Sequence, residues 1–541
     1  MSRRGGWTAA LAVAALLALR VAYARHLEFD SDEPQHLHVA WAWTRGLVPY
    51  RDVFDNHAPL FALASAPLLA RLGERADVLV PMRLALFPVF ALVLAALGWI
   101  GNTLFSPRAA RWGVVLAALW PEHFLTSLEY RPDALWSALW IASLAVLLAG
   151  RLRPARAAWA GLLAGAALGV SLKTVLLLAT LAAAAPLALA AAGTRAPRRL
   201  ASCVAAYAAG LAVIPAGIAA GFAARGSLGA LADDAVRHNL LPGLGPGARA
   251  LIFPAACVPL AWVARRVGAA GPDRALGARR AAVLLSAGLY LAALESFWPL
   301  LTPQDFLPFE PLALLLVAAW LVPGATAASA RAARGRVATA ALVALAELGV
   351  LVAGHPPWRD GARPGIELVR DALRLTRPDE TVMDLKGEMI YRPRAVFLVL
   401  ESVTRERIRR GLIADSIPER LVETRTAVVA NDSRFFPPRA RAFMDTSYVG
   451  VGRLRVAGRV LEVGGGTPRA FHLPVPGRYA VLAPGGPGRG RIDGRPWADA
   501  GVIAAGEHVY DPAPGEARVA VLWARAAESG YAPWSMENRR P

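Results

Sequence analysis

A chain of 541 residues in which 56% are hydrophobic and only 18% are charged is too apolar for a soluble protein of this length. Its formal net charge of +19 does not indicate nucleic-acid binding, because the arginines lie in short clusters between apolar runs rather than on a soluble domain. The two cysteines, Cys203 and Cys257, both lie inside apolar runs, which excludes a disulfide framework and a cysteine-based metal site. These features predict an integral membrane protein.

The N-terminal segment joins a pair of arginines to an apolar run from Trp7 to Tyr23, which predicts a first membrane helix. The run ends in Ala22-Tyr23-Ala24, which also resembles a signal-peptidase site, so a cleaved signal peptide is the alternative. Under either interpretation the following loop lies outside the cytoplasm.

This first outer loop, residues 25–78, is unusually dense in ionisable groups. Its stretch from Phe29 to Leu60 reads FDSDEPQHLHVAWAWTRGLVPYRDVFDNHAPL and mixes carboxylates, histidines and arginines. Charged side chains beside a bilayer are costly and usually functional. The loop is therefore the predicted site of chemistry.

Further apolar runs follow, and with the first they predict about eleven membrane helices within residues 1–354. The later runs are Val78–Leu104, Trp112–Leu128, Ala134–Gly150, Ala157–Val170, Val175–Ala192, Leu200–Ala223, Ala250–Val263, Ala281–Leu300, Phe306–Val322 and Val337–Val352. Arginine clusters fall in every second connection, near residues 108–111, 151–156, 195–199, 265–280 and 331–336. This positive-inside pattern places loop 25–78 and the C-terminal region outside the cytoplasm.

The composition changes after residue 354, where apolar runs shorten and Pro and Gly become more frequent. Residues 355–455 alternate helix-like and strand-like segments, which predicts a soluble α/β region. Residues 456–541 contain short alternating runs broken by Gly and Pro, which predicts a β-rich C-terminal domain. Trp497, Tyr510 and Trp523 are either aromatic platforms for sugars or core residues of that domain.

Four stretches together resemble a known family. Asp32-Glu33, a helix-like segment and then GLVPYRDVFDNHAPLF look like the first outer loop of the glycosyltransferase C superfamily, polytopic enzymes that use polyprenyl-phosphate sugars. Protein O-mannosyltransferases and lipid A aminoarabinose transferases belong to it. Further matches are LEYRPDALW from Leu128, SLKTV from Ser171 and TPQDFLPFEPLALLL from Thr302, although His57 stands where many relatives have Lys.

The resemblance implies inverting transfer of a sugar from a polyprenyl-phosphate donor to a cell-envelope glycan, lipid or protein, at the outer face of the cytoplasmic (inner) membrane. The donor's tail lies in the bilayer and its sugar at the surface, so such an enzyme needs several membrane helices and a polar site at the boundary. A carboxylate takes the acceptor's proton while cations stabilise the leaving phosphate. The expected partners are the donor, the acceptor and the lipid bilayer, not nucleic acid.

Asp32 is the first candidate for the base, and Glu33 and Asp133 are further candidate catalytic residues. The alternative for Asp32-Glu33 is a helix N-terminus, with Ser31 or Asp32 as N-cap and Pro34 in the first turn. The candidates for binding the donor phosphate or sugar are Arg51, Asp55, His57, Arg131 and Lys173. Ordinary loop charges, a solvated turn and a snorkelling lysine are the alternatives for these residues.

The residues demand no cofactor. His36 and His38 lie two apart on the expected helix and point to different faces, which does not predict a metal site. A divalent cation that assists the leaving phosphate is left open, although no carboxylate spacing requires one.

Two other functions remain open. A lipid-linked sugar transporter or flippase is also polytopic, but the sequence shows no repeat of broken helices. A non-catalytic glycan-assembly protein has the same hydropathy as an enzyme, so only activity separates the two.

Overall fold

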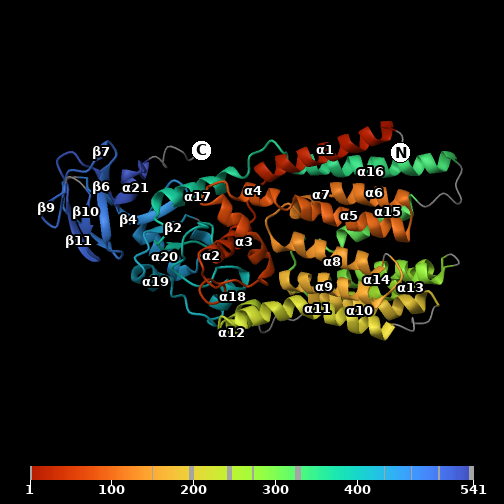
Figure 1. Cartoon of the computed structure of the whole chain (residues 1–541). Coiled ribbons are helices and arrows are strands. Elements are labelled where there is room, and N and C mark those ends of the chain that lie inside the picture. Colours follow the sequence, from red (N-terminus) through yellow and green to blue (C-terminus); the bar gives the residue numbers. More distant parts are fainter. Residues whose placement is uncertain are drawn as a thin grey trace. The chain divides into compact units, whose positions relative to one another are not determined.

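The computed structural model describes the chain except residues 1–2, 149, 194–199, 241–246, 271–272, 323–329, 432, 465, 498–499 and 535–541. The predicted arginine cluster at residues 195–199 lies outside the described residues. The chain divides into two compact units. Figure 1 colours the chain along its sequence. The helical unit comprises Met1–Leu27, Asn56–Ser65 and Val80–Asp360, and the mixed unit comprises Glu28–Asp55, Ala66–Leu79 and Gly361–Pro541.

Apolar helices build the helical unit, with α1 beside α16 and α8 to α11 next to one another (Figure 1). Its main helices are α1 (Arg3–His26), α5 (Phe87–Leu104), α6 (Pro107–Leu119), α7 (Pro121–Thr126), α8 (Pro132–Leu148), α9 (Pro154–Val170), α10 (Thr174–Ala191), α11 (Leu200–Ala223), α13 (Ile252–Ala269), α14 (Arg274–Phe297), α15 (Glu310–Leu321) and α16 (Ala330–Gly354). Two more, α3 (Leu60–Leu72) and α4 (Leu79–Leu84), contain the points where the chain passes between the units.

Six helical stretches among the described residues are long and apolar enough to cross a membrane. They are Leu79–Leu104, Thr174–Ala191, Leu200–Ala223, Gly247–Ala269, Arg274–Phe297 and Ala333–Gly354. Three shorter apolar helices are Leu60–Leu72, Pro132–Leu148 and Glu310–Leu321. The chain is thus a multi-pass membrane protein with a sheet-containing C-terminal region, and the count of about eleven helices stays a prediction.

The predicted spans Val78–Leu104 and Trp112–Leu128 are each interrupted in the structure, the first between α4 and α5. The run Trp112–Leu128 forms two helices, α6 and α7, which are separated at Trp120. Pro121 causes the break, because a residue before proline is disfavoured in the helical conformation and Trp120 adopts φ −55° and ψ 117°.

Small residues bring α9 and α11 into close contact. A Cβ atom on Gly161 of α9 would lie 2.0 Å from the carbonyl oxygen of Tyr207, and one on Gly210 of α11 would lie 2.1 Å from the carbonyl oxygen of Ala158. Membrane helices commonly associate in this way, because lipid offers no hydrophobic drive and backbone proximity improves van der Waals packing.

Helix α1 is integrated into the helical unit. The guanidinium of Arg20 is fully buried and donates to the carbonyl oxygens of Phe124 (3.1 Å) and Ser127 (3.3 Å). Tyr23 donates its hydroxyl to the carbonyl oxygens of Leu351 (3.2 Å) and His355 (2.6 Å). These contacts attach α1 to the α7 region and to the C-terminal end of α16.

The mixed unit combines helices with two sheets. Its helices are α2 (Glu33–Thr44), α17 (Arg363–Leu375), α18 (Ser402–Arg409), α19 (Ile417–Glu423), α20 (Pro438–Ser447) and α21 (Ala524–Glu528). Its strands are β1 (Val382–Met383), β2 (Val428–Ala430), β3 (Tyr448–Val451), β4 (Leu454–Glu462), β5 (Arg469–Leu473), β6 (Gly477–Ala483), β7 (Gly486–Pro487), β8 (Arg491–Ile492), β9 (Arg495–Pro496), β10 (Gly501–Ile503), β11 (Gly506–Asp511) and β12 (Arg518–Trp523).

The larger sheet runs β1-β2-β4-β12-β6-β10 and the smaller runs β5-β11-β8-β9. Strands β1 and β2 pair in parallel, whereas β4 and β12 are antiparallel, with Ala520 opposite Val460. Strand β4 crosses the predicted boundary at residue 455, so one sheet joins the α/β region to the β-rich region. The predicted domain bounds stay a prediction.

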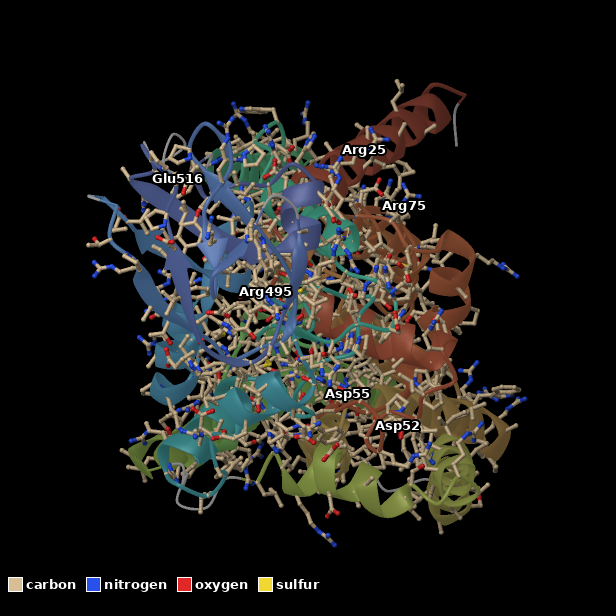
Figure 2. All side chains as sticks on the ribbon, turned by 90° about the vertical axis from the view of Figure 1, so that its left-hand side faces the viewer. Arg25, Asp52, Asp55, Arg75, Arg495 and Glu516 are labelled. Atoms are coloured by element: carbon tan, nitrogen blue, oxygen red, sulfur yellow. The ribbon has the colours of Figure 1, made fainter. Side chains whose placement is uncertain are left out.

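Of the three aromatic side chains considered as sugar platforms, Tyr510 is fully buried and donates its hydroxyl to Glu516 (2.7 Å), so it is a core residue. Trp523 packs edge-on against Tyr479, and Trp497 packs partly buried against the same core. Figure 2 labels Glu516 and Arg495 in this region.

Candidate functional site

Asp32 lies in the mixed unit at the start of α2. It occupies the N-cap position and Pro34 follows in the first turn, as expected for a helix N-terminus. However, the Asp32 carboxylate forms no capping hydrogen bond with the helix. The capping interpretation therefore explains its position in the chain but not the direction of its side chain.

The Asp32 carboxylate instead meets a lysine from the C-terminal region. The Nζ atom of Lys386 lies 2.5 Å from Oδ1 of Asp32 and 3.1 Å from Oγ of Ser31. Both charged side chains stay partly accessible, with 21% of Asp32 and 17% of Lys386 exposed. A carboxylate that is paired and still reachable from solvent is suited to meet a substrate hydroxyl or amine.

The loop that presents Lys386 is held by a buried ion pair. Nε of Arg394 lies 2.8 Å from Oδ1 of Asp384, and both side chains are almost fully buried. The Asp384 carboxylate also accepts the backbone N–H groups of Gly387 (2.9 Å) and Met389 (2.9 Å). The backbone on both sides of Lys386 is thereby fixed before any substrate binds.

The same loop packs against α2. Gly387 has φ +90°, and a Cβ there would lie 2.8 Å from Cβ of His38, so the turn requires glycine. His38 donates from Nδ1 to the carbonyl oxygen of Ile390 (2.8 Å). Burial lowers the pKa of His38 below its ordinary value, although the Ile390 carbonyl opposes this shift. A neutral imidazole is therefore part of the packing between α2 and the loop.

Glu33 differs from its neighbour Asp32. Its side chain is fully buried, and Oε2 accepts the backbone N–H of Asp30 at 2.9 Å. This contact stabilises the turn that leads into α2. The catalytic role of Glu33 stays a prediction.

The three donor-binding candidates of the loop 25–78 have different surroundings. Arg51 is half exposed and forms a two-point ion pair with Asp52, at 2.9 and 2.8 Å. The hydrogen bond from Arg51 lowers the pKa of Asp52. Asp55 is buried, His57 is partly buried, and Figure 2 labels Asp52 and Asp55 on the loop after α2. Arg51 thus already has a carboxylate partner, and the three roles stay predictions.

The remaining candidates form a second cluster, the Asp133 cluster, in the helical unit. Nζ of Lys173 lies 3.2 Å from Oδ1 of Asp133 and also contacts the carboxylate of Asp305. Nε of Arg131 lies 3.3 Å from Oδ2 of Asp133. Asp133 and Arg131 are buried, whereas 23% of the Lys173 side chain is exposed. The two positive charges of Lys173 and Arg131 therefore balance the two negative charges of the carboxylates within this cluster.

The carboxylate of Asp305 is held by Thr302. Its Oδ2 accepts the N–H (2.8 Å) and the hydroxyl (3.1 Å) of Thr302, which caps the short helix η3 (Pro303–Phe306). Burial opposes the charge of Lys173, but the two facing carboxylates outweigh it and raise its pKa. Lys173 therefore stays a cation at neutral pH.

Sequence reasoning missed Lys386 and Asp305. Asp305 lies inside the stretch from Thr302 that carried the family resemblance. Lys386 had a different signal, because Lys386 and Lys173 are the only two lysines among 59 basic residues. Each of them contacts a candidate catalytic aspartate.

Among the described residues, no group of three or more His, Cys, Asp or Glu side chains is arranged to hold a metal ion.

No protein family model and no curated protein matches the chain. Two solved structures of ArnT from Cupriavidus metallidurans, one in the apo state and one bound to undecaprenyl phosphate, match it with TM-scores of 0.57. Their sequence identities are 13% and 14%, and each match covers 84% of this chain and 98% of the ArnT chain. Archaeal oligosaccharyltransferase AglB from Archaeoglobus fulgidus, in complex with an inhibitory peptide and a dolichol-phosphate, gives a TM-score of 0.47 at 12% identity, over 93% of this chain and 75% of AglB.

The chain therefore shares its fold with ArnT, which agrees with the family resemblance in its sequence.

Proposed function

We propose that this protein transfers a sugar, with inversion, from a polyprenyl-phosphate-linked donor to a cell-envelope glycan, lipid or protein at the outer face of the cytoplasmic membrane. The observation that carries the proposal is the fold shared, over 84% of the chain, with an ArnT structure that holds undecaprenyl phosphate. The polytopic helical unit supports it, because a lipid-linked donor must be reached from within a bilayer.

Asp32 acts as the general base. Its carboxylate accepts the proton of the acceptor's hydroxyl or amine while the acceptor atom attacks the anomeric carbon on the side opposite the phosphate. The bond between that carbon and the phosphate oxygen breaks, and its electron pair leaves with the polyprenyl phosphate. A placed base contributes about 10²–10⁴ to the rate.

Lys386 is a positioning residue for Asp32. Its ammonium group contacts the carboxylate at 2.5 Å from a loop that the Asp384–Arg394 pair holds rigid. A charge-assisted hydrogen bond of this kind orients the base, and catalysis is sensitive to misplacement on the scale of 1 Å. Lys386 therefore favours one direction of the Asp32 side chain.

Arg131 and Lys173 stabilise the leaving phosphate, with Asp133 and Asp305 holding the two cations in place. Phosphate oxygens that bind Lys173 replace part of its contact with a carboxylate. Asp133 remains the second candidate for the base.

Mass spectrometry of cell-envelope glycans and lipid-linked sugars in a deletion strain tests this function. One envelope sugar should disappear while its polyprenyl-phosphate form accumulates. The purified protein should then move that sugar from the accumulated donor to the acceptor, which neither a flippase nor an assembly protein does. An unchanged glycan profile without donor accumulation contradicts the proposal.

A further inference from the structure

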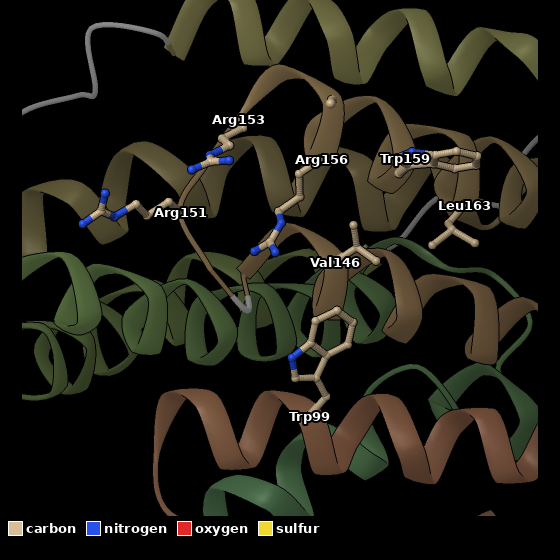
Figure 3. A pocket seen from close by; sticks show the side chains of 8 residues that line it. Trp99, Val146, Arg151, Arg153, Arg156, Trp159 and Leu163 are labelled. Atoms are coloured by element: carbon tan, nitrogen blue, oxygen red, sulfur yellow. The ribbon is translucent and has the colours of Figure 1, made fainter.

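A hollow of about 750 Å³ lies among three helices of the helical unit (Figure 3). Trp99 near the end of α5, Val146 near the end of α8, and Trp159 and Leu163 of α9 form its apolar lining. Trp159 is 63% exposed and Trp99 is 46% exposed. Arg151, Arg153 and Arg156 complete the lining.

The three arginines have no carboxylate partner among the described residues. Within the described part of the chain, none of them forms an ion pair, and Nη1 of Arg156 is buried without a hydrogen-bond partner. In Figure 3, Arg156 points from α9 and Trp99 from α5 into the space between the two helices. A buried guanidinium nitrogen without a hydrogen-bond partner is costly, and an anion bound here would supply that partner.

The backbone adds to this positive charge. Helix α9 begins at Pro154 with Arg153 as its N-cap, and the Arg153 side of the hollow is therefore the N-terminal end of a helix of 17 residues. The first N–H groups of a helix and its dipole favour negative charge there.

A second hollow, of about 540 Å³, shares Arg151 with the first. Leu178, Leu181 and Leu189 of α10 and Val204 of α11 give it a mainly apolar lining. Two apolar hollows that share one arginine are complementary to a molecule with a single anionic group and two hydrocarbon chains.

We propose that these hollows bind one anionic phospholipid. Its phosphate contacts Arg151, Arg153 and Arg156, one acyl chain packs beside Trp99 and Leu163, and the other enters the hollow between α10 and α11. Basic pockets between membrane helices are known to hold anionic headgroups, and an acyl chain is the occupant that suits an apolar lining inside a membrane. This site is separate from the proposed transfer reaction and does not depend on it.

Native mass spectrometry of the full chain in detergent tests the site, with phosphatidylglycerol and phosphatidylcholine of identical acyl chains as probes. We expect wild-type protein to retain phosphatidylglycerol preferentially. The triple variant Arg151→Gln, Arg153→Gln, Arg156→Gln should lose about tenfold to hundredfold in that retention, since each arginine near an anionic lipid contributes measurably. Equal retention of the two lipids by wild-type protein overturns the proposal.

A matched triple variant controls for overall charge. Arg108, Arg111 and Arg265 are exposed arginines outside both hollows, and changing all three to Gln removes the same net charge. This control variant should retain phosphatidylglycerol as wild-type protein does. Equal loss of retention in both triple variants would mean that only net charge attracts the lipid, which contradicts a specific lipid site. Replacing the three site arginines by Lys should restore most retention, and failure of this rescue in a protein with a wild-type elution profile also counts against the site.

The acyl chains are tested separately. Inorganic phosphate at millimolar concentration carries the anionic group without hydrocarbon, so it should not displace phosphatidylglycerol. Full displacement would mean that the hollows bind a small anion, and the assignment to a phospholipid would be wrong.

Discussion

Lysine and arginine are not equivalent partners for a carboxylate. Lysine offers a compact ammonium group with rotatable donors, whereas the guanidinium of arginine is a rigid planar fork. In this chain lysine occurs only at positions 173 and 386, and both ammonium groups contact aspartates. We therefore infer that the geometry at these two aspartates requires lysine rather than merely positive charge.

Changing Lys386 to Gln should lower kcat by about tenfold to hundredfold with little change in donor binding, because a charge-assisted contact is worth about 1.5–3 kcal/mol and each 1.4 kcal/mol is tenfold. Lys386→Arg should recover only part of this loss. Initial rates and donor affinity measured on purified variants check this expectation. As a control, Arg75→Gln removes an exposed ion pair with Asp77 in the same unit and should leave the rate unchanged. If Lys386→Gln has wild-type kcat, Lys386 does not position the base.

His38 predicts a pH dependence of stability. Because burial lowers its pKa below the ordinary value of 6.5, the unfolded chain binds a proton at higher pH than the folded chain does. The stability that comes from neutral His38 is complete above about pH 6.5 and is lost as the pH falls towards the lower pKa of the folded state. The apparent Tm of the wild-type protein should therefore fall as the pH is lowered from 7.5 to 5.5.

The variant His38→Gln keeps a donor for the Ile390 carbonyl but does not titrate, so its Tm should fall less over the same range, by about 2–4 °C for each kcal/mol. The difference between the two proteins isolates His38 from the other groups that titrate. Parallel pH curves would show that His38 is protonated equally in both states.

Sequence reasoning could select Asp32, because acidic residues beside a membrane helix are locally visible. It could not select Lys386, which is 354 positions away from Asp32 and reaches it only through the fold of the mixed unit. Asp305 was likewise hidden, since its contact with Lys173 depends on how η3 packs among the helices.

At the scale of the helix, local sequence explains where helices end better than where they pack. Pro121 indicates the break between α6 and α7, although the apolar run alone suggested one span. The contact between α9 and α11 is harder to predict from sequence, because the glycines indicate a close approach but do not identify the partner helix.

Replacing Gly210 by Leu should destabilise the helical unit by about 1–3 kcal/mol or prevent its folding, since a Cβ there already meets the backbone of Ala158 at 2.1 Å. Gly217→Leu on the same helix is the control, because a Cβ at Gly217 meets no atom within 4 Å. Thermal unfolding in one detergent compares the two. Equal stability of both variants would mean that α9 and α11 do not pack closely.

At the scale of the whole molecule, hydropathy predicted a membrane protein and the change of composition near residue 355 predicted a different C-terminal region. The pairing of strands was not predictable in the same way. Strand β4 pairs with the adjacent β3 and also with β2 and β12, and these last two partners are too far away in sequence to leave a local pattern.

The arrangement across the membrane is tested by cysteine labelling in a background without Cys203 and Cys257. Cysteines at the exposed positions Gly229 and Thr467 should react with an impermeant thiol reagent added outside cells, and one at exposed Arg111 should not. The opposite labelling pattern would invert the topology and remove the outer-face site.

The most direct test of the proposed chemistry measures donor binding and initial transfer rate on the same purified protein in nanodiscs, for Asp32→Asn, Asp133→Asn and Glu33→Gln. Asn keeps nearly the shape of Asp but does not take a proton at neutral pH, so Asp32→Asn should bind donor like wild-type protein while its turnover falls by about 10² or more. Wild-type turnover in Asp32→Asn together with an inactive Asp133→Asn would make Asp133 the base. Full rates in all three variants would contradict the glycosyltransferase assignment of these residues.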